Sequence, residues 1–252
     1  MSHPVAPVNK AKDSERIAKV IARAGLCSRR DAERWIADGR VSVNGTTLAS
    51  PAFTVVPSDR IVVDGKPLPA LEAPRLFLYH KPVGLVTTAR DEKNRATVFD
   101  NLPPGLPRLI SVGRLDLNSE GLLLLTNDGG LARYLELPAN ALARRYRARV
   151  HGAVTAAALA KLAQGVTVDG VNYGPIQARM EREQSGANVW VSVTLKEGKN
   201  REIRKVMSHL GLQVSRLIRT VYGPFELGDL PPGSAQEIRP DVLRAKLKGY
   251  FS

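Results

Sequence analysis

The chain has 252 residues, of which 43% are hydrophobic and 24% charged, which excludes a protein disordered throughout and gives enough length for two domains. No apolar run approaches the roughly 20 residues that a membrane-spanning helix needs, and the N-terminus lacks the apolar core of a signal peptide, so we expect a cytoplasmic protein. The formal net charge of +13 indicates a polyanionic partner, with nucleic acid the simplest candidate. The alternatives are a solvated basic surface and attraction to an anionic membrane; the membrane is disfavoured because no basic amphipathic helix with a broad aromatic-rich apolar face is evident.

After a Pro-containing tail at residues 1–12, the pattern predicts a small module at residues 13–66. Ser28 is placed to cap a helix that Gly39 ends, and Asn44-Gly45 is typical of a type I′ hairpin turn. The predicted elements are a helix at residues 17–24, a second helix after residue 28, a strand at 40–43 and another at 60–65.

Two arginines, Arg29 and Arg30, lie at the start of the second predicted helix. Guanidinium groups and free backbone N–H groups can both meet phosphate at a helix N-terminus; the alternative is that they only solvate the helix start. The single cysteine, Cys27, excludes an internal disulfide and a zinc site built on several thiolates. We expect it to pack as a small apolar residue.

A Pro-rich stretch at residues 67–74 predicts a linker, and a second domain follows at residues 75–238. Its first apolar run predicts a strand that ends at Lys81-Pro82. Residues 87–108 are polar and then rich in Pro and Gly, which predicts a loop region with little core of its own.

The most informative stretch covers residues 111–130. Residues 122–125 form an apolar run closed by Asn, Asp and two Gly, which predicts a buried strand and then a helix at 130–137. Arg114 and Asp116 lie between apolar residues just before this strand, where a buried carboxylate is costly unless it is paired. Asp116 is therefore either a structural cap or a carboxylate held for chemistry.

Residues 144–152 alternate strictly, with Tyr146 on an apolar side and Arg145, Arg147 and Arg149 on the other. The arginine side is either a solvated edge or a stripe that binds phosphate. By its position on an apolar strand side alone, Tyr146 would be a core residue.

The rest of the pattern predicts helices and strands around a second basic cluster. Arg201, Arg204 and Lys205 lie in the first turns of a helix that Asn200 could cap, where cations oppose the helix dipole and thus indicate an anionic partner. The other predicted elements are a helix at 155–164, strands at 189–195 and from 214, and a tail or short helix at 239–252. The four histidines show no metal-ligand spacing.

The motif Gly113-Arg114-Leu115-Asp116, followed by Ser119-Glu120-Gly121 and the apolar run, resembles the signature of the RsuA/RluB branch of the pseudouridine synthases. Residues 145–152 and 197–204 resemble the family's second and third motifs. The resemblance implies that Asp116 is the catalytic aspartate, that Tyr146 lies under the target base, and that Arg204 pairs with Asp116. It also implies an α+β fold, with a mixed, mainly antiparallel sheet flanked by helices around a central cleft.

The N-terminal module resembles the small αL RNA-binding domain named after a ribosomal small-subunit protein, the S4-like domain. Its matching stretches are residues 16–21, 27–33 and 39–45. Together the two resemblances imply a set of RNA contacts. The candidates are Arg114, Lys81, Lys199, Arg201, Arg29 and Arg30, with Lys81 a candidate for either RNA backbone contact or structural support.

The implied activity is isomerisation of a uridine in ribosomal RNA to pseudouridine, by an aspartate in a pocket that receives the flipped base. Residues 197–204 and 214–219 most resemble enzymes acting on 23S large-subunit RNA; a 16S enzyme or a non-catalytic RNA-binding assembly factor are the alternatives. A glycosidase using Asp116 with Glu120 would not explain the basic charge. We expect ribosomal RNA or a pre-ribosomal particle as partner, a monomer, no membrane, no metal and no cofactor.

Overall fold

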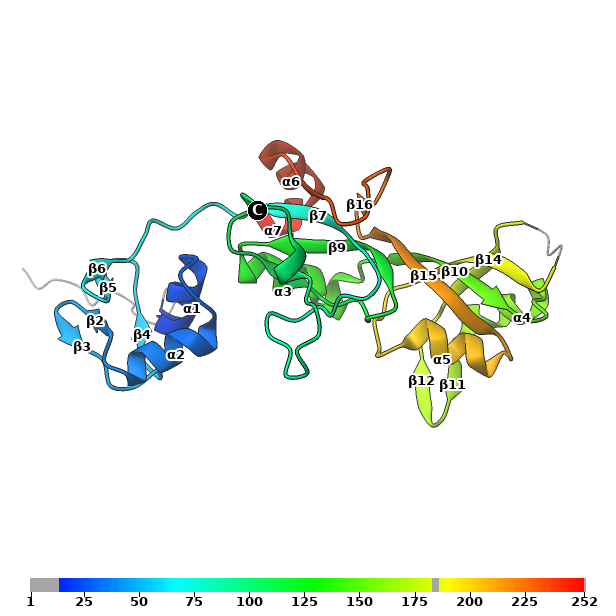
Figure 1. Cartoon of the computed structure of the whole chain (residues 1–252), viewed down its shortest axis with the longest axis horizontal. Helices are drawn as coiled ribbons and strands as arrows, with labels where there is room; N and C mark the ends of the chain where they lie inside the picture. Colours follow the sequence, from blue (N-terminus) through cyan, green and yellow to red (C-terminus); the bar gives the residue numbers. More distant parts are fainter. Residues whose placement is uncertain (1–13, 183–185, 252) are drawn as a thin grey trace, which may run out of the picture. The chain divides into compact units, whose positions relative to one another are not determined.

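The computed structural model describes residues 14–182 and 186–251. The predicted tail at residues 1–12 lies outside these ranges. The chain divides into two compact units, residues 1–73 and 74–252, each with its own sheets (Figure 1) and its own apolar clusters. The domain limits expected from the sequence remain predictions.

The N-terminal unit packs two helices against short strands. The hydroxyl of Ser28 accepts the Asp31 N–H at 3.1 Å, and the Asp31 carboxylate accepts the Ser28 N–H at 3.3 Å, a reciprocal pair that satisfies two otherwise free helix donors. Cys27 is buried in the apolar core. Asn44 and Gly45 both have positive φ, as a type I′ turn requires.

The expected helices and strands of this unit occur in the predicted order, together with further two-residue strands. They are β1 (Glu15–Arg16), α1 (Ile17–Arg23), α2 (Arg29–Ala37), β2 (Val41–Val43), β3 (Thr46–Thr47), β4 (Thr54–Val55), β5 (Ile61–Val63) and β6 (Lys66–Pro67). Strands β3-β2-β5-β6 form one sheet and β1 pairs with β4. Pro67 pairs with Val62, so the first residue of the expected linker belongs to this sheet.

One nine-stranded sheet forms the frame of the C-terminal unit, and it is antiparallel except where β9 and β15 run parallel. The path is β13-β14-β10-β15-β9-β7-β17, with β16 paired to β15 and β8 to β9. The strands are β7 (Leu76–Lys81), β8 (Ile110–Val112), β9 (Glu120–Thr126), β10 (Arg144–His151), β13 (Gln177–Met180), β14 (Asn188–Leu195), β15 (Gln213–Tyr222), β16 (Phe225–Glu226) and β17 (Ala235–Glu237). A separate hairpin joins β11 (Val166–Val168) to β12 (Val171–Tyr173).

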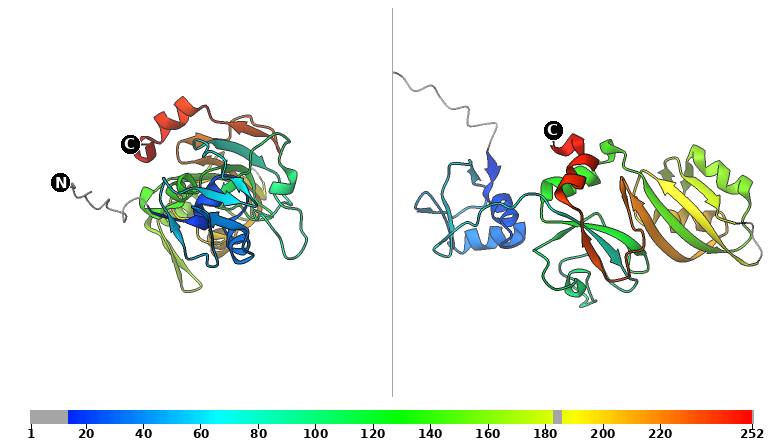
Figure 2. Two further views of the ribbon diagram at one scale, coloured as in Figure 1. Left: turned by 90° about the vertical axis from the view of Figure 1, so that its left-hand side faces the viewer. Right: turned by 90° about the horizontal axis from the view of Figure 1, so that it is seen from above.

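Helices cover this sheet on both faces, at different places (Figure 2). One apolar core lies under α4 (Ala156–Lys161) and α5 (Glu202–His209) and continues along the whole sheet. A second core lies between β7, β9 and the helices α3 (Gly129–Glu136), α6 (Pro240–Lys246) and α7 (Lys248–Phe251). The mixed, mainly antiparallel α+β architecture expected from the sequence is confirmed.

Three expectations for this unit are wrong in detail. The segment at residues 87–108 does contribute to the core, because Val98 is fully buried next to a short 3₁₀ turn at Phe99–Asn101. Asn200 does not cap α5: the helix begins after Arg201, whose backbone is left-handed with φ 53° and whose side chain caps nothing. The helix expected at residues 155–164 ends at Lys161 and continues as a 3₁₀ turn at Leu162–Gln164; a further 3₁₀ turn at Pro138–Asn140 follows α3.

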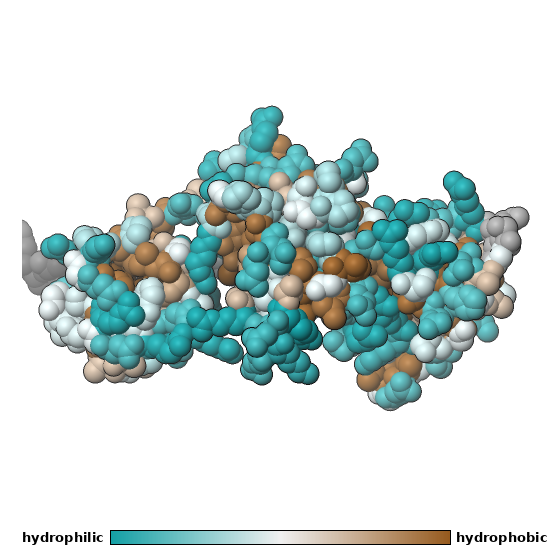
Figure 3. All heavy atoms as spheres, in the orientation of Figure 1, coloured by the Kyte–Doolittle hydropathy of each residue, from teal (hydrophilic) through white to brown (hydrophobic). Residues whose placement is uncertain are grey.

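Hydrophilic side chains cover most of the face of the molecule seen in Figure 3, with hydrophobic residues confined to smaller patches between them. Within the described parts of the chain, no helix combines the length and apolar character needed to cross a membrane.

Gly121 allows β9 and β15 to approach closely. It has φ +101°, and a Cβ at this position would lie 2.3 Å from the carbonyl oxygen of Arg219 and 2.8 Å from its nitrogen. Both neighbours are backbone atoms of the paired strand, so they cannot move aside as a flexible side chain would. The parallel pairing therefore depends on the missing side chain.

We predict that Gly121→Ala lowers the free energy of unfolding by at least about 3 kcal/mol, because positive φ and a backbone clash add. The matched control is Gly105→Ala. Gly105 has φ +83° but open space around it, so only the conformational cost of about 1–2 kcal/mol applies. Urea denaturation of both variants checks this, and equal losses would contradict the clash.

Candidate active site

Asp116 lies in the loop between β8 and β9, with its side chain half-buried. The loop is tight: the Ser119 N–H donates to the Asp116 carbonyl at 3.0 Å. At its start, the Gly113 N–H donates to the Glu136 carboxylate at 2.6 Å. The loop therefore has a defined backbone conformation before any substrate binds.

The chain segment that follows β7 makes hydrogen bonds to alternate residues of this loop. The Thr87 hydroxyl donates to the Leu115 carbonyl at 2.9 Å and accepts the Leu115 N–H at 3.3 Å. The Gly84 N–H donates to the Leu117 carbonyl at 2.8 Å. These contacts flank Asp116 on both sides, so its position is fixed by residues about 30 positions earlier in the sequence.

Lys81 supplies the third contact, donating to the carbonyls of Ser119 and Pro82, both at 2.9 Å. Its side chain is fully buried, so the possibility of an RNA backbone contact is wrong and the structural alternative holds. Burial lowers the pKa of Lys81 to about 8, although the negative charges of Asp116 and Glu120 oppose this shift.

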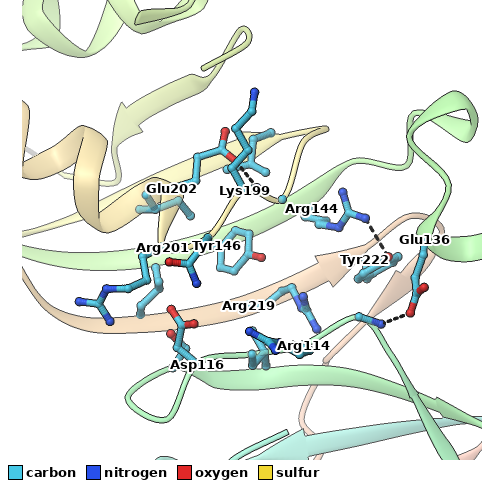
Figure 4. Close-up of a pocket in the computed structure, with 18 residues that line it drawn as sticks. Arg114, Asp116, Glu136, Arg144, Tyr146, Lys199, Arg201, Glu202, Arg219 and Tyr222 are labelled. Carbon is cyan, nitrogen blue, oxygen red and sulfur yellow. Dashed lines mark hydrogen bonds between the residues drawn. The ribbon is translucent and has the colours of Figure 1, made fainter. Parts of the chain in front are cut away.

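A pocket of about 360 Å³ opens beside the loop (Figure 4). Its walls come from the Asp116 loop, β10, β15 and the start of α5. The lining residues are Gly113, Arg114, Leu115, Asp116, Ser119, Glu136, Arg144, Tyr146, Leu195, Gly198, Lys199, Asn200, Arg201, Glu202, Ile203, Leu217, Arg219 and Tyr222.

Asp116 and Tyr146 lie on this same pocket but come from distant parts of the chain (Figure 4). Tyr146 points inward from β10 and is 9% exposed, so one part of its ring is open to the pocket while the rest packs in the core. The structure thus brings these two predicted residues together.

Arg219 and Arg144 are pocket residues to which the sequence patterns assigned no role. Arg219 is 2% exposed; its Nε donates to the Leu122 carbonyl at 2.7 Å and its Nη2 has no partner among the described residues. The guanidinium groups of Arg144 and Arg219 lie 4.7 Å and 5.1 Å from the ring centre of Tyr222. A buried guanidinium group with a free donor favours an anion in the pocket.

The predicted ion pair between Arg204 and Asp116 is not found among the described residues. The guanidinium group of Arg204 instead donates to the backbone carbonyls of Asn118 and Val214, at 2.8 and 2.9 Å. Burial and the nearby charge of Arg201 lower its pKa, while Asp116 opposes them. Arg204 lines no part of the pocket, and it acts on the Asp116 loop through the Asn118 carbonyl.

The remaining residues of this unit that are predicted to contact RNA line the pocket. They differ in whether other residues already bind their charged groups. Arg114 and Arg201 are exposed and line it. Lys199 also lines it, but its ammonium group is paired with Glu197 and donates to the Asn172 carbonyl at 2.8 Å. Arg114 and Arg201 are therefore the more available cations.

Three carboxylates line the pocket, and only one is without a donor in the described structure. Glu136 accepts the Gly113 N–H, and Glu202 accepts the Lys199 N–H at 2.9 Å. Burial raises the pKa of Glu202. No hydrogen bond to the Asp116 carboxylate is found among the described residues, so this carboxylate is the one available for chemistry.

Arg29 and Arg30 belong to the N-terminal unit, where they form the exposed first turn of α2. The capping box of Ser28 and Asp31 already occupies two backbone donors there. Elsewhere in the described structure, no cluster of three or more His, Cys, Asp or Glu side chains is arranged to hold a metal ion.

Comparison with known families gives two matches. Residues 75–209 match the model of the RNA pseudouridylate synthases, and residues 15–61 match the S4 domain.

The chain belongs to the RNA pseudouridylate synthase family.

Three bacterial relatives show how similar the chain is to other members of this family. An uncharacterised RNA pseudouridine synthase of Rickettsia prowazekii is 48% identical over 236 residues, which cover 94% of this chain and 99% of that protein. Ribosomal large subunit pseudouridine synthase B of Pasteurella multocida is 42% identical, covering 94% of this chain and 71% of that protein. The enzyme of the same name from Pseudomonas aeruginosa is 43% identical, but this chain spans only 59% of its length.

A solved structure described as the crystal structure of pseudouridylate synthase matches the fold with a TM-score of 0.64 at 25% identity. The match covers 92% of this chain and 99% of that one. Both units of this pseudouridylate synthase thus have counterparts among known proteins.

We predict that the buried amine of Lys81 makes stability rise with pH. Its pKa is about 8 in the folded protein, against 10.5 for a free lysine side chain. Between these values the unfolded chain keeps the proton that the folded protein has lost, so the free energy of unfolding increases with pH.

Urea denaturation at pH 7.5 and pH 9.5 checks this prediction in the wild type and in Lys81→Met. The gain in unfolding free energy between the two pH values should be larger in the wild type. Equal gains would show that Lys81 does not titrate in this range. The comparison removes the contributions of other groups, which are common to both proteins.

Proposed function

We propose that this protein isomerises a uridine of ribosomal RNA to pseudouridine, and that this uridine lies in the RNA of the large subunit. The family match and the names of the relatives at 42–43% identity support the reaction and the RNA class. The observation that carries the proposal is the pocket itself: Asp116, the one lining carboxylate without a donor in the described structure, shares it with Tyr146 and several arginines.

The reaction breaks the bond between N1 of uracil and C1′ of ribose and forms a bond from C5 to C1′. C5 loses its proton, and N1 gains a proton. Atoms and electrons balance without an oxidant or a group donor. The uridine must leave its stack to enter the pocket, which costs a few kcal/mol. Tyr146 would stack on the extruded base, a contact worth about 1–3 kcal/mol.

The functional group of each residue at the pocket suggests its role in the proposed reaction. Asp116 would supply the carboxylate that acts on the sugar, and Arg204 would hold its loop through the Asn118 carbonyl. Arg219, with its free Nη2, would bind the anionic phosphate of the flipped nucleotide together with Arg114. A guanidinium group suits this role because its donors match phosphate oxygens.

The N-terminal unit would provide a separate RNA contact. Residues 15–61 match the S4 domain, and Arg29 and Arg30 are exposed at the start of α2. Ribosomal RNA or a pre-ribosomal particle would be the partner, with the protein acting as a cytoplasmic monomer without a small-molecule cofactor.

The first test is pseudouridine mapping of ribosomal RNA from cells that lack the protein, rescued with the wild type or with Asp116→Asn. We expect one uridine to lose its modification and to regain it only with the wild type, because asparagine cannot replace the carboxylate. Rescue by Asp116→Asn, or no change at any uridine, would leave an RNA-binding factor as the better description. A change in small-subunit RNA alone would correct the subunit.

A second prediction concerns Thr87, which holds the Asp116 loop but does not line the pocket. Thr87→Val keeps the shape and removes the hydroxyl, so kcat should fall roughly tenfold to a hundredfold while KM changes little. Thr87→Ser keeps the hydroxyl and should restore kcat. Loss in both variants would point to packing of the methyl group instead.

A further inference from the structure

The sheet of the C-terminal unit is covered on only one face at its β13-β14-β10 end. Residues along β10 and β14 alternate, and every second side chain lies in the apolar core on the pocket side. On the opposite face the side chains of both strands are half-buried or exposed, and none of the apolar clusters of the described structure covers them.

Five arginines converge on this uncovered face, which is here named the arginine face: Arg145, Arg147 and Arg149 of β10, Arg179 of β13 and Arg216 of β15. The strand register brings them together. Arg149 lies directly opposite Arg216, and Ser192 of β14 lies between Arg147 and Arg179. Like charges directly opposite each other destabilise a sheet, so the fold carries a cost that a bound anion would offset.

Acidic residues neutralise only part of this charge. Arg147 pairs with Glu181, and Arg216 pairs with Glu120. Arg145, Arg149 and Arg179 are exposed and have no ion pair among the described residues. Glu226 is a third acidic residue at this face. Five arginines therefore stand against three acidic residues in the described structure, and the net charge of the face is positive.

The arginine face also has shape and an aromatic side chain. Arg145, Arg147 and Arg179 line a hollow of about 520 Å³. The guanidinium group of Arg147 lies 4.7 Å from the ring centre of Trp190, which is half-buried and lies opposite Arg149. Arginines interleaved with an aromatic ring that is partly open to solvent are typical of surfaces that bind nucleic acid.

We propose that the arginine face is a further RNA-binding surface, the second of the C-terminal unit, which binds the backbone of RNA flanking the target uridine. This inference rests on the proposed function, since it takes the substrate to be RNA. Alternate residues of a strand lie about 6.8 Å apart, which is close to the distance between successive phosphates of an RNA strand. Arg145, Arg147 and Arg149 can therefore follow one strand of RNA.

The chemistry favours RNA over other anionic partners. A membrane surface would require exposed apolar side chains among the cations, and the exposed large apolar residues of the described chain all lie on other segments. An acidic protein would need a further aromatic or arginine side chain in the right place to stack on Trp190, whereas every nucleotide carries a base that can stack. The pocket lies on the opposite face of the same sheet, so RNA bound here is a flanking segment and not the reacting nucleotide.

The test uses the full chain with Arg145→Gln, Arg149→Gln and Arg179→Gln combined. The matched control removes the same charge elsewhere, from Arg133, Arg244 and Lys248 on the helices α3, α6 and α7, which are exposed and without ion pairs in the described structure. Binding to a transcript of large-subunit ribosomal RNA is measured against salt concentration. Each arginine that contacts phosphate contributes about 1 to the slope of log affinity against log salt.

We expect the triple variant to lose roughly tenfold or more in affinity and to reduce the slope by about 2–3, while the control changes neither. Circular dichroism establishes that both variants are folded. Equal losses in the two variants, or no loss in the triple variant, would overturn the proposal and leave a solvated surface.

Activity separates this inference from the proposed function. Pseudouridine formation is measured on the long transcript and on a short stem-loop cut from around the modified uridine. The triple variant should lose kcat/KM on the long transcript and keep it on the stem-loop, which is too short to reach the arginine face. A wild type that binds RNA but modifies neither substrate would contradict the proposed function alone; equal loss on both substrates would contradict the inference alone.

Discussion

Gly121 and Arg219 meet backbone to backbone where β9 and β15 run parallel, and the sheet of the C-terminal unit continues across this contact. On each side of this contact the strands form an antiparallel group. Without the contact the two groups would be separate sheets. Asp116 precedes β9 on one side, while Tyr146 lies on β10, the next strand after β15 on the other. The pocket exists because this one contact brings the two groups together.

The electrostatics of the pocket follow from how its charged groups are held. Arg144 and Arg219 are fixed by backbone carbonyls and by the ring of Tyr222, not by acids. Their positive charge is therefore available to a ligand, while Glu136 and Glu202 are occupied by backbone N–H groups. Preorganised cations next to the one lining carboxylate without a donor in the described structure would suit a substrate that carries phosphate beside the bond to be broken.

Local pattern was enough to predict most helices and the longer strands, because alternation, caps and turn residues act over a few positions; most of the two- and three-residue strands were not predicted. The resemblance to family motifs, and not local pattern, pointed to Asp116 and Tyr146, which share a pocket in the structure. It gave no role to Thr87 and Arg219, whose contacts join segments 28 and 97 residues apart. Arg204 was assigned to Asp116 by position in a motif, but backbone carbonyls satisfy its guanidinium group; such competition cannot be read from a sequence.

The contacts that hold the Asp116 loop have a regular spacing. Lys81, Gly84 and Thr87 are three residues apart, and they engage Ser119, Leu117 and Leu115, which are two residues apart. The two segments run in opposite directions, and all three contacts form together only when each segment has its present length. A single residue inserted between Gly84 and Thr87 would shift the Asp116 carboxylate without altering any residue of the pocket, so the length of this connection determines where the carboxylate lies in the pocket.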